Sequence, residues 1–185
     1  MKTQKFFSIA ILGLALVFGA NSFAQKTVTV GGAPMYPTKN IVENAVNSKD
    51  HTTLVDAVKA GGLVETLQSK GPFTVFAPTN EAFAKLPGGT VETLLKPENK
   101  TMLQGVLTYH VVAGKLDSKA IAVAIKAGNG TAVFTTVQGG KIWCKMMGKK
   151  LVITDEKGNM STVTIADVYQ SNGVIHVVDS VIMHS

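Results

Sequence analysis

The sequence contains no arginine and only one cysteine, and each scarcity excludes a class of function. All eighteen basic residues among the 185 are lysine, whereas dedicated recognition of phosphates or base edges usually relies on the planar, bidentate guanidinium group. Sequence-specific binding of nucleic acid is therefore not expected. The single cysteine, Cys144, excludes a disulfide within the chain and a zinc site built from several thiolates.

The motifs of common catalytic and nucleotide-binding sites are also missing. There is no Walker loop, no Gly-x-Ser-x-Gly elbow and no His-Glu-x-x-His helix. The four histidines, His51, His110, His176 and His184, have no acidic partner at a spacing that suggests a catalytic or metal site. We therefore predict a protein that is not an enzyme, with no catalytic residues, no metal and no cofactor.

The first 24 residues have the layout of a secretory signal peptide. Two lysines in residues 1–5 precede an apolar stretch over residues 6–20, and Ser22 and Ala24 stand where a signal peptidase reads small residues. The apolar stretch is shorter than the roughly 20 residues that a membrane-spanning helix needs. We predict cleavage after Ala24, which removes two lysines and lowers the net charge from +6 to +4. The mature chain is expected to be secreted, either periplasmic or extracellular.

Apolar residues, by contrast, are plentiful. They make up 45% of the chain and charged residues 16%, which suits a packed core and not a disordered chain. The length and the lack of an internal repeat predict one domain. Residues 25–39 contain Gly31-Gly32, Pro34 and Pro37, and we predict a flexible lead-in there. The domain itself is predicted to cover residues 40–184.

The order of the predicted elements indicates the fold class. Apolar residues at helical spacing predict short helices at 40–47, 52–60, 63–67, 79–86, 97–111 and 117–125. Strands are predicted at 73–77, 132–137, 141–147, 151–154, 162–165 and 174–183. Most helices come first, a run of antiparallel strands follows, and strands do not alternate with helices as in a parallel sheet. We therefore predict an α+β domain.

Two histidines lie on apolar faces of these elements. His110 continues a helical stripe that includes Leu103 and Leu107, and His176 alternates with Val174 in the last strand. We interpret both as core residues whose ring nitrogens bond to the backbone, because a buried polar group must be satisfied. A role as a ligand or a catalytic base is the alternative.

One predicted strand has two contrasting faces. Cys144 and Met146 fall on the side that we predict to be buried, whereas Lys141, Trp143 and Lys145 fall on the opposite side. Such an exposed face could bind a polyanion, for example an anionic polysaccharide, extracellular DNA or anionic lipid headgroups. The alternative is that the lysines only guard the edge of a sheet.

Three segments resemble the fasciclin domain, an extracellular interaction module. Residues 74–83 are similar to the first signature block of that family, Tyr109-His110 to its Tyr-His motif, and residues 171–179 to its closing block. The order and spacing of the three segments also agree. The resemblance implies a wedge of antiparallel β-strands with a cluster of short helices on one side, and a role in adhesion in place of catalysis.

The same resemblance implies where partners bind. In animal members of the family, integrin binding is assigned to the Tyr-His region and to an acidic-aliphatic segment before the closing block. These correspond here to Tyr109 and His110, and to Asp167 and Val168. We expect an unidentified protein or glycan of a cell surface or matrix as the partner, together with weak polyanion binding and self-association.

The alternative function is an extracytoplasmic carrier that holds a small apolar ligand or a lipid between the helices and the strands. A hydrophobic cavity larger than packing requires would favour this carrier.

Overall fold

The strands of the protein form one small and one large sheet. The computed structural model describes residues 27–185, so the predicted signal peptide (1–24) lies outside the described residues. The small sheet is a hairpin of β1 (Val28–Val30) and β2 (Ala33–Met35). The large sheet has seven strands in the spatial order β4 (Val111–Ala113), β3 (Phe73–Pro78), β9 (Gly173–Val178), β8 (Met160–Gln170), β7 (Lys150–Thr154), β6 (Lys141–Met147) and β5 (Ala132–Thr135).

The large sheet is almost entirely antiparallel and curls back on itself. The one parallel pair is β3 with β9, which differs from the uniformly antiparallel wedge that was expected. The two edge strands approach each other, because Val112 forms a bridge with Thr136 and the Val137 N–H donates to the Val111 carbonyl at 2.7 Å. The chain just after β5 therefore joins β4, and the two ends of the sheet meet at this point.

All the helices of the described residues lie between residues 41 and 127. Within the described residues they are α1 (Ile41–Ala45), α2 (Thr52–Gly61), α3 (Val64–Gln68), α4 (Asn80–Ala84), α5 (Thr90–Leu94), α6 (Lys100–Tyr109) and α7 (Ser118–Ala127), with 3-10 turns at Lys49–His51 and Pro97–Asn99. Pro97 starts the second of these turns, so α6 begins later than predicted. The α+β class is confirmed.

Local capping explains where several helices begin and end. The side chains of Asn40, Thr79 and Asp117 accept hydrogen bonds from backbone N–H groups three residues ahead, at the starts of α1, α4 and α7. Gly62 ends α2 in the left-handed conformation, at φ +70°. These signals are all readable in the sequence.

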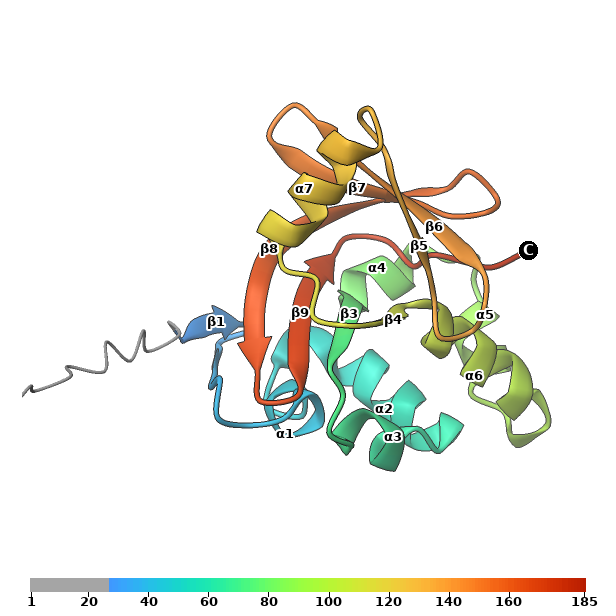
Figure 1. Cartoon of the computed structure of the whole chain (residues 1–185). Helices are drawn as coiled ribbons and strands as arrows, with labels where there is room; N and C mark the ends of the chain where they lie inside the picture. The colour runs from blue at the N-terminus through green and yellow to red at the C-terminus, as the bar shows by residue number, and fades with distance from the viewer. Residues whose placement is uncertain (1–26) are drawn as a thin grey trace, which may run out of the picture.

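Two apolar cores lie on opposite faces of the sheet (Figure 1). The first core lies between the sheet and the helices α1–α6, with Leu54, Leu107 and Ile175 among its members. The second core is enclosed by the curled sheet and α7, and includes Ile121 and Cys144. In Figure 1, α1, α2 and α3 lie together below the sheet, whereas α7 lies beside its upper strands.

The β1–β2 hairpin stands where a flexible lead-in (25–39) was expected. Its turn is Gly31-Gly32, both with positive φ, and Val30 and Met35 are buried in the first core. A Cβ atom on Gly31 would lie 2.4 Å from the Ser48 Oγ, so the close approach also requires glycine. Glycine and proline are typical of flexible segments, but burial against distant helices orders this one.

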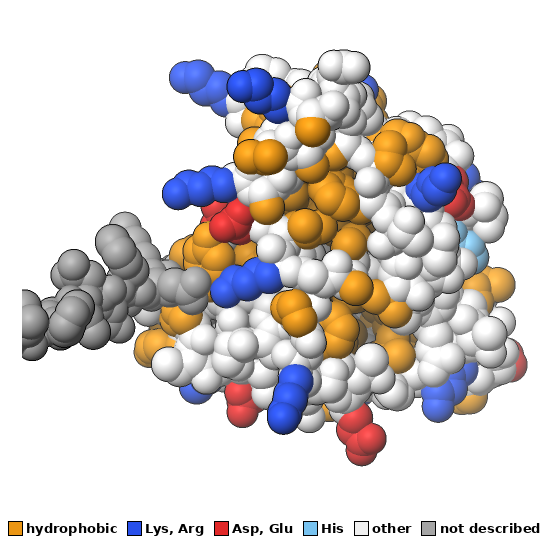
Figure 2. Space-filling view, viewed as in Figure 1, with side chains coloured by type: hydrophobic (Ala, Val, Ile, Leu, Met, Phe, Trp, Pro, Cys, Tyr) orange, Lys and Arg blue, Asp and Glu red, His pale blue; other side chains and the backbone are white. Residues whose placement is uncertain are grey.

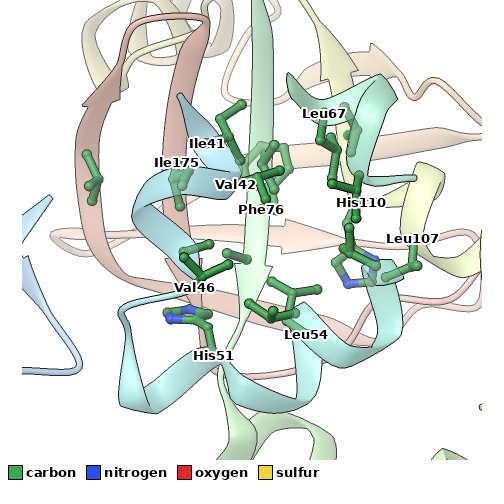
Figure 3. A pocket seen from close by; sticks show the side chains of 18 of the residues that line it. Ile41, Val42, Val46, His51, Leu54, Leu67, Phe76, Leu107, His110 and Ile175 are labelled. Carbon is green, nitrogen blue, oxygen red and sulfur yellow. The ribbon is translucent and has the colours of Figure 1, made fainter. Parts of the chain in front are cut away.

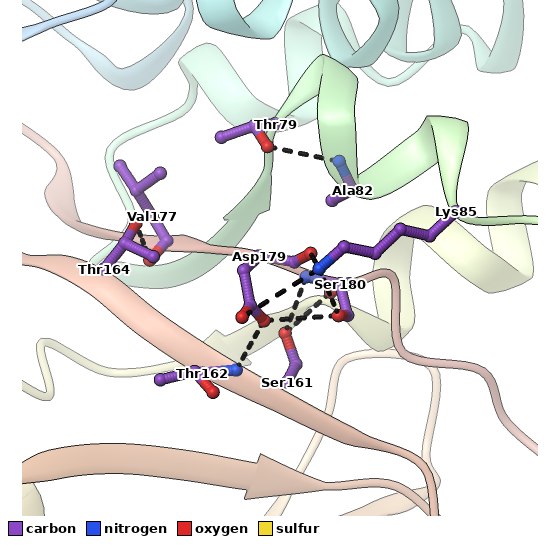
Figure 4. A network of polar contacts seen from close by, with 9 residues as sticks. All are labelled: Thr79, Ala82, Lys85, Ser161, Thr162, Thr164, Val177, Asp179 and Ser180. Carbon is purple, nitrogen blue, oxygen red and sulfur yellow. Dashed lines mark hydrogen bonds and ion pairs between the residues drawn. The ribbon is translucent and has the colours of Figure 1, made fainter.

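A polar network fixes the chain just after β9 (Figure 4). The Asp179 carboxylate accepts from the Thr162 N–H at 2.8 Å, and the Lys85 ammonium donates to the Asp179 carbonyl at 2.5 Å. The Ser161 hydroxyl donates to the Ser180 carbonyl at 2.7 Å. The end of α4 is thereby tied to β8 and to the segment that follows β9.

His110 is a core residue, as predicted, and both of its ring nitrogens are bonded. Its Nδ1 donates to the Val106 carbonyl at 2.8 Å, and its Nε2 accepts from the Ile182 N–H at 3.1 Å. Burial lowers the pKa of His110 to about 4, so the ring is neutral at pH 7.

His176 has the same arrangement in the centre of the sheet. Its Nε2 donates to the Leu116 carbonyl at 2.8 Å, and its Nδ1 accepts from the Asp167 N–H at 3.4 Å. Burial lowers its pKa as well. The ring joins β9 to the bulge in β8 and to the segment before α7.

Replacing His110 by Ala should destabilise the domain strongly. The change leaves a cavity and removes the partners of the Val106 carbonyl and the Ile182 N–H. We expect a loss of roughly 2–4 kcal/mol in the free energy of unfolding, measured by chemical denaturation. His184→Ala, at the partly exposed end of the chain, should cost well under about 1 kcal/mol. Equal stability of His110→Ala and the parent would contradict this role.

The lowered pKa of His110 should also make stability depend on pH. The folded-state pKa of about 4 lies below the unfolded value of 6.5, so the unfolded state takes up the proton first. The stabilisation is complete above pH 6.5 and is lost as the pH falls toward 4, by about 1.4 kcal/mol per pH unit from this group. Denaturant titrations at several pH values measure this slope. His110→Gln cannot titrate and should have a shallower slope, whereas an unchanged slope would assign the effect to other groups.

Candidate functional site

Tyr109 and His110 lie at the end of α6, inside the domain. The Tyr109 hydroxyl donates to the Lys141 carbonyl at 2.6 Å and accepts from the Glu156 N–H at 3.2 Å. Burial raises the pKa of Tyr109 to about 12. Both side chains are buried, so a partner cannot touch them unless the domain opens locally. Their role in partner binding stays a prediction from the resemblance.

Asp167 and Val168 lie at an irregularity in the pairing of β8 with β9. Asp167 has a φ of +59°, and its carboxylate accepts from the N–H and the hydroxyl of Ser118 at the start of α7. Val168 is buried in the first core. Of the four residues that the resemblance assigned to binding, only Asp167 is partly exposed, and its carboxylate is already engaged.

The lysine–tryptophan face is the side of β6 that carries Lys141, Trp143 and Lys145. Because β6 lies between β5 and β7, it is an interior strand of the sheet. Within β6, however, Lys141 pairs only with β5 and Lys145 only with β7, whereas Trp143 pairs with both neighbours. Each lysine therefore lies beside an unpaired stretch of backbone, and protection of that stretch remains the alternative explanation. Lys141 is exposed and Lys145 half-buried, and neither belongs to the ion pairs of the described residues, which are Lys59–Asp56 and Lys85–Asp179.

Apolar side chains extend this face across four strands. Val133, Trp143, Thr154 and Met160 are aligned in register on β5, β6, β7 and β8. Val133 is 52% exposed and Met160 is 54% exposed, with Trp143 half-buried between them. Partly exposed apolar side chains beside lysines that form no ion pair are typical of an interaction surface.

Glu156 is the acidic residue whose side chain is hydrogen-bonded to β6 in the described part of the chain, and its partners include backbone N–H groups. Its carboxylate accepts from the N–H groups of Lys141 and Ser185, at 2.9 and 3.1 Å. These hydrogen bonds lower the pKa of Glu156 to about 2. It therefore stays ionised and offsets part of the positive charge at the start of β6.

The opposite side of β6 forms part of the second core. Cys144 is buried as predicted, and burial raises the pKa of its thiol to about 12. Met146 was also predicted to be buried, but it is 46% exposed. It lies next to the hairpin turn at Gly148, and this end of β6 extends beyond the second core.

A cavity of about 250 Å³ lies in the first core, between α1 and α2 and the strands β3 and β9 (Figure 3). Its walls are almost wholly apolar, and include Val42, Leu54, Val58 and Ile175. A void of this size exceeds what packing leaves in an ordinary core, where gaps larger than a water molecule are few. It is the observation that was expected to favour a carrier.

His51 also lines this cavity, although no sequence pattern distinguishes it from the other histidines. It is buried, and its Nδ1 lies 2.9 Å from the Ser48 hydroxyl. Its Nε2 has no hydrogen-bond partner. No local pattern marks this residue, because its position depends on the packing of α1 and α2 against the sheet.

Residues 27–185 contain no cluster of three or more histidine, cysteine or acidic residues that could hold a metal ion. None of the helices in this part of the chain is long and apolar enough to cross a bilayer. Figure 2 shows, on the side that carries α7, exposed apolar side chains in the middle of the face and lysines projecting at its periphery.

Comparisons with known proteins agree with the geometry. The chain is 45% identical over 182 residues to protein sll1483 of Synechocystis, covering 94% of this chain and 92% of that protein. It is 31% identical to human periostin over 144 residues, which cover 78% of this chain and 16% of periostin.

Solved structures and family models point the same way. A structure described as a FAS1 domain pair from the insect cell adhesion molecule fasciclin I matches with a TM-score of 0.70 and 17% identity. The match covers 78% of this chain and 51% of that one, and it shows the fold alone. The model of the fasciclin domain matches residues 49–184. The chain therefore belongs to the fasciclin-domain family.

Proposed function

We propose that this protein is an extracellular, non-enzymatic adhesion module whose lysine–tryptophan face binds an anionic polysaccharide of a cell surface or matrix. The family supports the general role, because it is known for adhesion-related extracellular proteins. The observation that carries the specific role is that Lys141 and Lys145 flank Trp143 on one face of β6, and that neither lysine belongs to an ion pair of the described residues.

The chemistry of the face favours a linear anionic polymer. Lysines two residues apart on one strand stand roughly 7 Å apart and present a row of charges. Without arginine, the face lacks the bidentate donor that suits phosphate, which argues against DNA. Trp143 is half-buried in the row with Val133 and Met160, where it can pack against a sugar ring of the polymer.

Charge reversal on β6 should abolish binding. We expect Lys141→Glu with Lys145→Glu to remove retention on a heparin column, because exposed charges provide the attraction. The melting temperature should stay within a few degrees of the parent's. Lys70→Glu with Lys96→Glu makes the same change in net charge at exposed positions outside β6, and should leave most of the retention. Equal losses in both double variants would show attraction by net charge alone, and stronger retention on DNA than on heparin would reassign the ligand.

Trp143 should report the binding directly. It is the only tryptophan in the chain, so its emission comes from the proposed face alone. We expect added heparin to shift the emission maximum or change its intensity, and about 0.5 M salt to reverse the change by screening the charges. A titration in which retention occurs without any change in emission would place the polymer elsewhere on the surface.

A further inference from the structure

We propose that the cavity between α1, α2 and the sheet binds a small, neutral amphiphile. This ligand has an apolar body and one hydroxyl or similar group that hydrogen-bonds to the Nε2 of His51. The site would give the protein a second function, as a carrier, beside the adhesive role of the lysine–tryptophan face. The two functions rest on different residues and can be tested separately.

The hydrogen bonding of the buried histidines carries this inference. His110 and His176 each bond through both ring nitrogens. The Nδ1 of His51 bonds to Ser48, whereas no group meets hydrogen-bond geometry at its Nε2, and the backbone of Ala77 is the polar group that approaches the ring. Buried polar groups in native proteins nearly always have a hydrogen-bond partner. An unsatisfied nitrogen in the wall of a cavity therefore points to a missing ligand group.

The electrostatics of the cavity require that the ligand be neutral. Burial is the main cause of the lowered pKa of His51, with the nearby Ala77 carbonyl and Asp50 acting against it without reversing the shift. The ring is therefore uncharged at pH 7 and cannot compensate an anion. The surrounding walls are apolar, and a charge placed among them would lose its hydration. Neutral imidazole can donate or accept, so a hydroxyl group suits either tautomer.

The volume sets the size of the ligand. A cavity of about 150 Å³ takes benzene, with six carbon atoms. By proportion, the 250 Å³ present here takes roughly ten non-hydrogen atoms. An apolar ligand body in this pocket would cover apolar wall surface, which is favourable in proportion to the area removed from water.

The cavity also has a way in. Two of its lining residues reach the surface: Val46, at the end of α1, is 50% exposed, and Lys59 on α2 is exposed beside Asp56. Val46 is hydrophobic and α1 is only five residues long. Entry between α1 and α2 therefore requires small movements of a short helix and leaves the sheet unchanged.

Two probes of equal size test the site. 1-Octanol and nonane both have nine non-hydrogen atoms, and only octanol can bond to His51. We expect both to shift the NMR signals of the methyl groups of Val42, Leu54 and Ile175, and to raise the melting temperature. Val58→Phe, which fills the cavity, should abolish these effects. Val123→Phe, at an exposed position on α7, should not. If Val58→Phe does not fold, Ala45→Leu fills the cavity from α1.

The role of His51 is tested by the ratio of the two affinities. His51→Phe keeps a ring of similar size without nitrogen atoms, and should lower the affinity for octanol relative to nonane about five- to tenfold, the effect of one hydrogen bond. His51→Gln retains a hydrogen-bonding group and should restore most of the ratio. The proposal is overturned if neither probe shifts the lining methyl signals, or if binding persists in a folded, cavity-filled variant. An unchanged ratio in His51→Phe overturns the assignment of the polar contact. Heparin retention should be the same in all these variants.

Discussion

A buried imidazole ring has two nitrogens that must both find partners, and much of this fold is arranged around that requirement. His110 connects the end of α6 to Ile182, far along the chain. His176 connects β9 to the bulge at Asp167 and to Leu116 before α7. These contacts join segments that no local signal would bring together. They also explain why Tyr109-His110 is buried, because the two hydrogen bonds of His110 hold α6 against the C-terminal segment.

The curled sheet separates the two candidate sites. On its concave side the strands and α7 close the second core, which leaves the outer side of β6 partly exposed. On the other face the helices α1 and α2 are short, and they leave a void against β3 and β9. The lysine–tryptophan face and the cavity thus lie on different parts of one sheet. A substitution in one site is therefore not expected to alter the other.

The sequence predicted those parts of the fold that local chemistry controls. Thr79, Asp117 and Gly62 mark helix ends through groups within three or four residues. The strand at 141–147 was predicted with correct bounds because its alternation is clear. The β1–β2 hairpin, the parallel pairing of β3 with β9 and the exposure of Met146 depend on contacts distant in the chain, and were missed.

The candidate sites also combine features that local sequence predicts with features that depend on distant contacts. Lys141, Trp143 and Lys145 were found from their alternation, since a strand places every second residue on one face. Only the sheet order showed that β6 is interior. That order has a consequence for assembly. The edge strands β4 and β5 have only three and four residues, and Val112 of β4 forms a bridge with Thr136 just after β5. Such short edge strands offer little backbone to an added strand, which disfavours growth of a continuous β-sheet from these two edges.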